Sequence, residues 1–122
     1  MTQGTSHGTG RMGERLVRAV YEARGWRCTH SNYRAGPKEI DLVMAKGAAV
    51  AFVEVKTRAG DSPDEALDHV GPRKVGRVTA AARHWIHHHG GPGQRYRFDV
   101  AGVRLAACET EIRVIHDAWR IG

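Results

Sequence analysis

Two carboxylates and a lysine lie close together in the middle of the chain. Asp41 lies in the apolar segment 39–45, and Glu54 and Lys56 lie in the apolar segment 49–57. Two such segments with a short Gly-containing break between them are typical of a β-hairpin. Because side chains alternate between the two faces of a strand, Glu54 and Lys56 are predicted to share one face.

The register of this hairpin decides where Asp41 lies. A two-residue loop at Lys46-Gly47 pairs residues whose numbers sum to 93, which places Asp41 diagonal to Glu54. A four-residue loop gives sums of 95 and places Asp41 directly opposite Glu54. Both registers put the two carboxylates on one face, and only an odd loop without a bulge separates them.

Paired carboxylates with a nearby lysine are suited to metal-assisted phosphodiester hydrolysis. Two carboxylates on one face repel each other unless a proton or a cation intervenes, and oxygen ligands suit Mg²⁺ or Mn²⁺. Lys56 adds a donor that could orient water or offset charge on a phosphate. The alternative is that Asp41 and Glu54 are surface carboxylates of the hairpin and that Lys56 is their salt-bridge partner.

The charge distribution favours a polyanionic partner. The 122 residues include 19 Lys and Arg against 13 Asp and Glu, a formal net charge of +6. Four acidic residues and no Lys or Arg lie in 61–70, whereas seven basic residues and one acidic residue lie in 71–104. The longest apolar run, 48–53, is far shorter than a membrane span requires. Nucleic acid, and not a membrane, is the expected partner.

Hydrophobic periodicity predicts one α/β domain over residues 11–122 after a flexible tail at 1–10. The predicted elements, in order, are a helix from about residue 10 to 24, a strand at 26–33, the two hairpin strands, a helix from Pro72, and strands at 96–105 and 111–115.

The start of the second helix is a candidate phosphate-binding region. Arg73, Lys74 and Arg77 follow Pro72, where free backbone N–H groups and basic side chains meet an anion together. The alternative is an ordinary solvated helix face.

Seven short segments follow one another as in the YraN-like family of predicted endonucleases, so the chain resembles that family over about residues 12–119. These segments are Gly13-Glu14-Arg15, Asn32-Tyr33-Arg34, Glu39-Ile40-Asp41-Leu42-Val43, Phe52-Val53-Glu54-Val55-Lys56-Thr57-Arg58, Arg73-Lys74, Arg97-Phe98-Asp99-Val100 and Ile115-His116. The chain is also similar, more distantly, to archaeal Holliday-junction resolvases. Pro37-Lys38 departs from the family, which usually has glycine before the Glu-Ile-Asp run.

The resemblance implies a restriction-endonuclease-like fold, in which helices flank a mixed five-stranded sheet. It implies a PD-(D/E)xK site in which Asp41 and Glu54 bind Mg²⁺ or Mn²⁺, Lys56 is the catalytic lysine and Glu14 is a further acidic residue. Arg58, directly after the lysine motif, is expected to contact nucleic acid with the basic residues of the second helix. A homodimer follows by analogy with the resolvases.

Glu14 also has a structural interpretation, because it lies in the first turn of the predicted helix, four residues before Arg18. The two cysteines, Cys28 and Cys108, form no metal or disulfide pattern, which favours free thiols in a cytoplasmic protein.

The sequence therefore predicts a metal-dependent endonuclease acting on DNA, including structured or branched DNA. A non-catalytic nucleic-acid-binding protein of the same fold is the main alternative. An adaptor that binds an acidic protein is a third.

Overall fold

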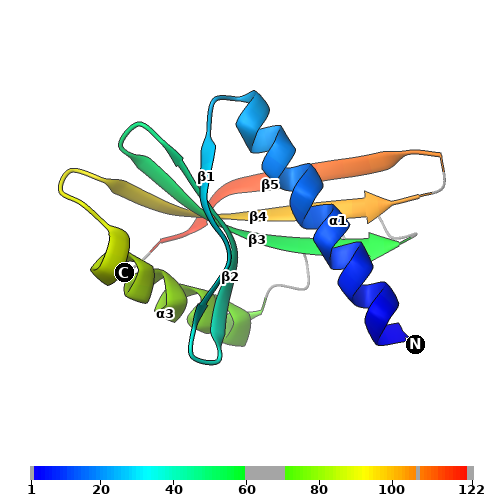
Figure 1. Cartoon of the computed structure of the whole chain (residues 1–122), viewed down its shortest axis with the longest axis horizontal. Helices are drawn as coiled ribbons and strands as arrows, with labels where there is room; N and C mark the ends of the chain where they lie inside the picture. The colour runs from blue at the N-terminus through cyan, green and yellow to red at the C-terminus, as the bar shows by residue number, and fades with distance from the viewer. Residues whose placement is uncertain (1, 60–70, 107, 121–122) are drawn as a thin grey trace.

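A computed structural model describes residues 2–59, 71–106 and 108–120 of the chain (Figure 1). Its elements are α1 (Thr2–Ala23), β1 (Arg27–Ala35), β2 (Lys38–Lys46), β3 (Ala49–Ala59), α3 (Pro72–His89), β4 (Arg95–Leu105) and β5 (Thr110–Trp119). The predicted order of a helix, three strands, a helix and two strands is confirmed.

The strands of the described residues form one mixed five-stranded sheet in the order β1-β2-β3-β4-β5. Strands β3 and β4 are parallel, and the other neighbouring pairs are antiparallel. A parallel pair needs a long connection between its strands, and α3 lies in this one.

Each face of the sheet packs on one helix. The side chains of Val17 and Tyr21 in α1 pack on one face, against β3 and β4 among others, and Figure 1 shows α1 crossing these two strands. On the other face, Trp85 of α3 contacts Phe52 with ring centroids 5.6 Å apart. The core is therefore two apolar layers divided by the sheet.

Helix α1 packs through small and apolar residues that recur every four positions. Gly13, Val17 and Tyr21 are buried, as expected for one face of a helix. The helix ends at Ala23, and Gly25 follows with a φ of +91°, the left-handed conformation that commonly caps a helix. The N–H groups of Gly25 and Trp26 donate to the last-turn carbonyls of Glu22 and Tyr21.

Helix α1 begins at Thr2, within the segment 1–10 that was expected to be a flexible tail. Gly, Thr and Ser lower helix propensity by about 1 kcal/mol each or less, and residues 2–10 contain no proline to stop propagation. The predicted acidic loop at 58–70 lies largely outside the described residues. Neither described helix is long and apolar enough to cross a membrane.

We expect Gly13→Ala to lower the free energy of unfolding by about 1–3 kcal/mol, because the packed core resists an added methyl group. A Cβ at Gly13 would lie 1.9 Å from Oγ1 of Thr57. Thr57→Ala removes that oxygen, so the double variant should recover most of the loss in urea unfolding. Gly76→Ala, where a Cβ meets no atom within 4 Å, is the matched helix control. An equal loss in the single and double variants would contradict the close contact.

Candidate functional site

The sheet divides where β2 leaves β3. Strand β2 pairs with β3 from Lys46–Ala49 to Leu42–Val53 and no further. Beyond Leu42, residues 38–40 of β2 pair with β1, and the rest of β3 continues beside β4. We call the divergence beyond the Leu42–Val53 pair the fork.

The register of the hairpin places both predicted carboxylates at the fork. The pairs between β2 and β3 sum to 95, the value that sets Asp41 opposite Glu54. The loop is not the predicted four-residue loop, and it does not lie at Lys46-Gly47. Instead, Lys46 pairs with Ala49 across a two-residue turn at Gly47-Ala48, and the φ of +58° at Gly47 suits that tight turn.

Asp41 replaces a missing strand-to-strand hydrogen bond at the fork. Its Oδ2 accepts a hydrogen bond of 2.7 Å from the backbone N–H of Val55. The residue is 9% exposed. This bond fixes the Asp41 carboxylate beside β3, although the two backbones no longer pair there.

Glu54 is a buried carboxylate with an incomplete set of partners. It is 2% exposed, and its Oε1 has no hydrogen-bond partner among the described residues. Its Oε2 lies 3.0 Å from Nζ of Lys74 and 4.0 Å from Nζ of Lys56. Burial, followed by the negative charge of Asp41, raises the pKa of Glu54 from 4.5 to about 8, while Lys74 acts in the opposite direction.

Lys74 contacts this carboxylate more closely than the lysine identified in the sequence. Sequence reasoning grouped Lys74 with Arg73 and Arg77 as a phosphate-binding residue, because the three follow one another on one helix. The fold brings the first turn of α3 over Glu54, and the Lys74 amine forms its ion pair there. The composition offered a signal that each lysine could have a particular role, because the chain has only four Lys against 15 Arg.

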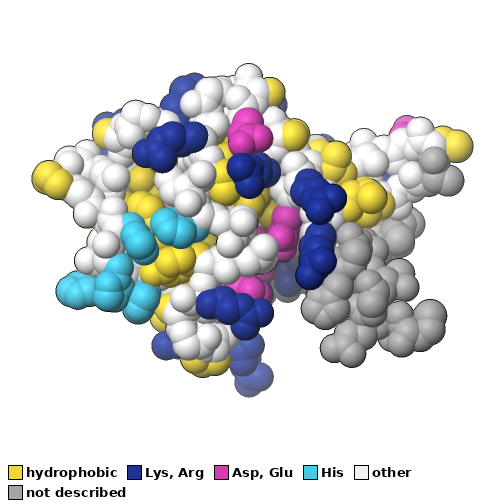
Figure 2. Space-filling model, in the orientation of Figure 1, with side chains coloured by type: hydrophobic (Ala, Val, Ile, Leu, Met, Phe, Trp, Pro, Cys, Tyr) yellow, Lys and Arg dark blue, Asp and Glu magenta, His cyan; other side chains and the backbone are white. Residues whose placement is uncertain are grey.

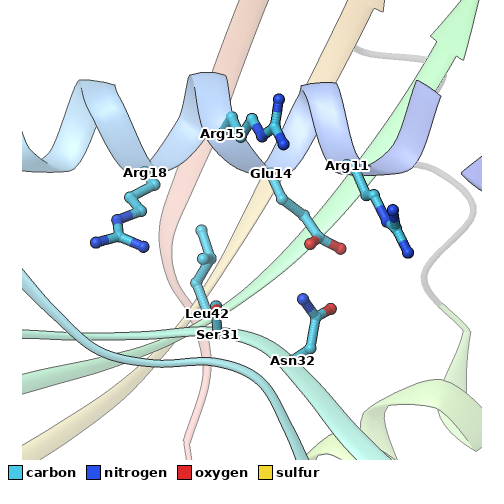
Figure 3. A pocket seen from close by; sticks show the side chains of 7 residues that line it. All are labelled: Arg11, Glu14, Arg15, Arg18, Ser31, Asn32 and Leu42. Atoms are coloured by element: carbon cyan, nitrogen blue, oxygen red, sulfur yellow. The ribbon is translucent and has the colours of Figure 1, made fainter. Parts of the chain in front are cut away.

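Glu14 approaches the fork from α1. Its side chain points from the helix towards Asn32, in a pocket of about 420 Å³ whose wall includes Arg11 and Arg18 (Figure 3). Burial, followed by the charge of Asp41, raises the pKa of Glu14 from 4.5 to about 7, and a hydrogen bond with Asn32 acts against this. The predicted pair with Arg18 is not formed, since Arg18 binds Glu22 at 3.1 Å.

Asn32 is a site residue that the sequence reasoning missed. It lies in β1 opposite the fork, and its φ is +52°, a value that few non-glycine residues adopt. Asparagine tolerates this conformation better than most residues, so the backbone can turn the amide towards Glu14. The hydrophobic pattern of a strand does not indicate where a residue with positive φ interrupts it.

Basic side chains border the acidic site. Arg73 and Arg77 are exposed on α3, and Arg58 is exposed near the end of β3. Figure 2 shows acidic side chains on this face lying between Lys and Arg side chains. The predicted nucleic-acid-binding arginines are therefore accessible to a ligand.

Carboxylate oxygens are the ligand atoms that the fork offers to a cation. Asp41 and Glu54 supply carboxylates at the two sides of the fork, and Oε1 of Glu54 lacks a partner. Within residues 2–59, 71–106 and 108–120, no group of three or more His, Cys, Asp or Glu side chains is placed to hold a metal ion. The pair and its free oxygen fit a hard cation that keeps several water ligands.

Comparison with known proteins identifies the family. The model of "Uncharacterised protein family UPF0102" matches residues 13–103. The chain belongs to the UPF0102 family. The family resemblance inferred from the short segments is thereby confirmed, and the matched range contains every predicted site residue.

Relatives from several bacteria share this UPF0102 sequence over most of their length. A UPF0102 protein of Alkaliphilus metalliredigens is 37% identical over 93% of this chain and 99% of its own. One from Nitrosococcus oceani is 34% identical over 99% of this chain and 98% of its own. One from Anaeromyxobacter dehalogenans is 41% identical over 88% and 78% respectively.

The raised pKa of Glu54 predicts a pH-dependent stability in the presence of EDTA. The folded protein binds this proton more tightly than the unfolded chain does, so the free energy of unfolding falls as pH rises from about 4.5 to 8. One such group contributes a slope of up to about 1.4 kcal/mol per pH unit. Glu54→Gln should flatten the fall in urea unfolding measured between pH 5 and 8. Glu22→Gln, an exposed control, should keep it, and an unchanged slope in Glu54→Gln would refute the assignment.

Proposed function

We propose that this UPF0102 protein is a metal-dependent endonuclease that hydrolyses phosphodiester bonds in DNA. The observation that carries the proposal is the buried Asp41–Glu54 pair at the fork, with two lysine amines beside Glu54. The mixed sheet with one helix on each face supports a restriction-endonuclease-like fold of the PD-(D/E)xK type.

Asp41 and Glu54 would hold Mg²⁺ or Mn²⁺. Such an ion lowers the pKa of a bound water and polarises a phosphoryl oxygen. A cation held there would favour the ionised form of Glu54, whose pKa burial and Asp41 raise to about 8. Glu14 adds a third carboxylate on the α1 side of Asp41, as the resemblance to the resolvases implies.

The two lysines act on charge at the reacting phosphate. Lys74 balances Glu54 in the free protein, and Lys56, the catalytic lysine of the motif, lies 1 Å further from the same oxygen. An ammonium group beside the fork orients the attacking water or stabilises negative charge that develops on the phosphate.

The basic residues that border the site indicate the class of substrate. Arg58, Arg73, Lys74 and Arg77 are the predicted contacts to the nucleic-acid backbone, and the net charge of +6 favours its approach. Structured or branched DNA is the proposed target, by the similarity to archaeal Holliday-junction resolvases. A cytoplasmic homodimer belongs to the same proposal.

One observation favours a second function, a non-catalytic nucleic-acid-binding protein of the same fold. Lys74 occupies an oxygen of Glu54 that a metal would use, as a structural ion pair would. This alternative predicts salt-dependent binding that Arg73→Ala or Arg77→Ala weakens and that EDTA leaves unchanged.

Cleavage assays test the catalytic proposal. Junction, flap, duplex and single-stranded DNA are incubated with the protein and Mg²⁺ or Mn²⁺. We expect Asp41→Asn and Glu54→Gln to reduce cleavage at least about 100-fold, because each removes a charged metal ligand. Glu109→Gln, at an exposed carboxylate, should cleave like the wild type. Equal behaviour of wild type and Asp41→Asn on all substrates would refute the proposal.

The Lys74–Glu54 pair predicts the effect of each lysine on metal affinity. A cation must displace Lys74 from Oε2 of Glu54, so Lys74→Gln should bind Mn²⁺ roughly fivefold more tightly at pH 9. Lys56→Gln should have a smaller effect, because its amine is more distant. Titration followed by electron paramagnetic resonance measures both, with the exposed Lys38→Gln as control. Weaker Mn²⁺ binding by Lys74→Gln would contradict this competition.

A further inference from the structure

A third buried carboxylate lies on the α1 side of the sheet, apart from the fork. Asp99 of β4 is 0% exposed. Its Oδ2 accepts a hydrogen bond of 2.5 Å from the hydroxyl of Tyr21, and its Oδ1 accepts one of 2.9 Å from the backbone N–H of Asp117. Asp99 thus joins α1, β4 and β5, which offsets the cost of burying its charge.

Asp99 also orients two partly exposed groups. Nε of Arg97 lies 3.1 Å from its Oδ1. Nδ1 of His116 lies 2.9 Å from Oδ2. In the protonated imidazole, Nδ1–H donates this hydrogen bond and Nε2–H remains as a donor for an external ligand. The Arg97 guanidinium is held further by the ring of Trp26, 4.8 Å from its centroid.

These groups line a pocket of about 270 Å³ at the C-terminal end of α1. Its wall contains Arg24, Arg97 and His116 together with the rings of Tyr21 and Trp26. None of the lining residues that the structure describes carries a carboxylate, and Asp99 is already paired with Arg97. The carbonyl of Arg24 at the helix end, which would repel an anion, accepts a hydrogen bond of 2.7 Å from Lys46.

We infer that this pocket binds a phosphate group, with Arg97, Arg24 and His116 as its donors. The three side chains come from β4, from the residue after α1, and from β5, so they surround a ligand from different directions. A tetrahedral phosphate accepts hydrogen bonds from several directions, and guanidinium groups match its oxygens. The group belongs to a free nucleotide or to a nucleic-acid backbone.

A neighbouring surface favours an extended ligand. Arg97 also lines another pocket, of about 380 Å³, together with Arg95 and Arg120. The carboxylate of Asp117 in that pocket is occupied by Arg120. A ligand with more than one phosphate can therefore contact Arg97 from both pockets. The inference does not depend on hydrolysis at the fork.

The test uses binding of inorganic phosphate, adenosine monophosphate and a fluorescein-labelled single-stranded oligonucleotide, in EDTA. Phosphate ligands should shift the His116 imidazole signals in NMR spectra of the full chain, and acetate should not. His116→Asn keeps a donor to Asp99 and removes Nε2, and Arg24→Gln changes an exposed residue. Each should weaken binding roughly tenfold, by loss of a charged or well-oriented donor. His87→Asn and Arg83→Gln, exposed on α3, are the matched controls.

The pattern of losses decides the outcome. Loss for all three ligands assigns a phosphate site, and loss for the oligonucleotide alone assigns the phosphate to a nucleic-acid backbone. Wild-type affinities in both variants would overturn the inference and leave the Asp99 cluster a structural link. These binding measurements contain EDTA and have no cleavage readout, so failure of the cleavage proposal is seen separately.

Discussion

The burial of two like charges at the fork is the constraint on which the rest of the structure depends. Asp41 and Glu54 leave water at the point where β2 and β3 stop pairing, and their burial is unfavourable without compensating partners. The protein supplies the N–H of Val55 to one carboxylate and the amine of Lys74 to the other. Among the described residues, one oxygen of Glu54 has no hydrogen-bond partner. The site is therefore held in place by the fold but is electrostatically incomplete, which is the condition that the proposed cation site requires.

Both helices that build the core also serve this site. Gly13 lets α1 lie against Thr57 of β3, and the next residue along the helix, Glu14, is thereby brought towards Asp41. On the other face, the residues that bury α3 on the sheet fix the position of its first turn, and Lys74 lies in that turn. Packing and site geometry are thus coupled. A change that shifts either helix moves a charged group at the fork as well as apolar side chains.

Local patterns in the sequence predicted the elements, and they failed where the deciding contact is distant along the chain. The shared face of Glu54 and Lys56 follows from strand alternation, and the end of α1 follows from Gly25. The turn was predicted one residue early, because Lys46-Gly47 and Gly47-Ala48 are both acceptable turns and only strand pairing chooses between them. The ion pair of Lys74 with Glu54 spans 20 residues and depends on how α3 docks. No periodicity within one element contains that information.

The two sets of buried carboxylates differ in a way that separates their roles. Asp99 interacts through hydrogen bonds or ion pairs with Tyr21, Arg97, His116 and a backbone N–H. Its charge is therefore balanced, and both of its oxygens are occupied. A cation would have to break these contacts, and the partly exposed donors above Asp99 instead favour an anion. At the fork the balance is reversed, because three carboxylates approach one another and the pKa values of Glu14 and Glu54 rise. Burial alone does not distinguish the two clusters. The ratio of donors to carboxylate oxygens does, and it supports the proposed cation at the fork and the inferred phosphate in the pocket beside Arg97.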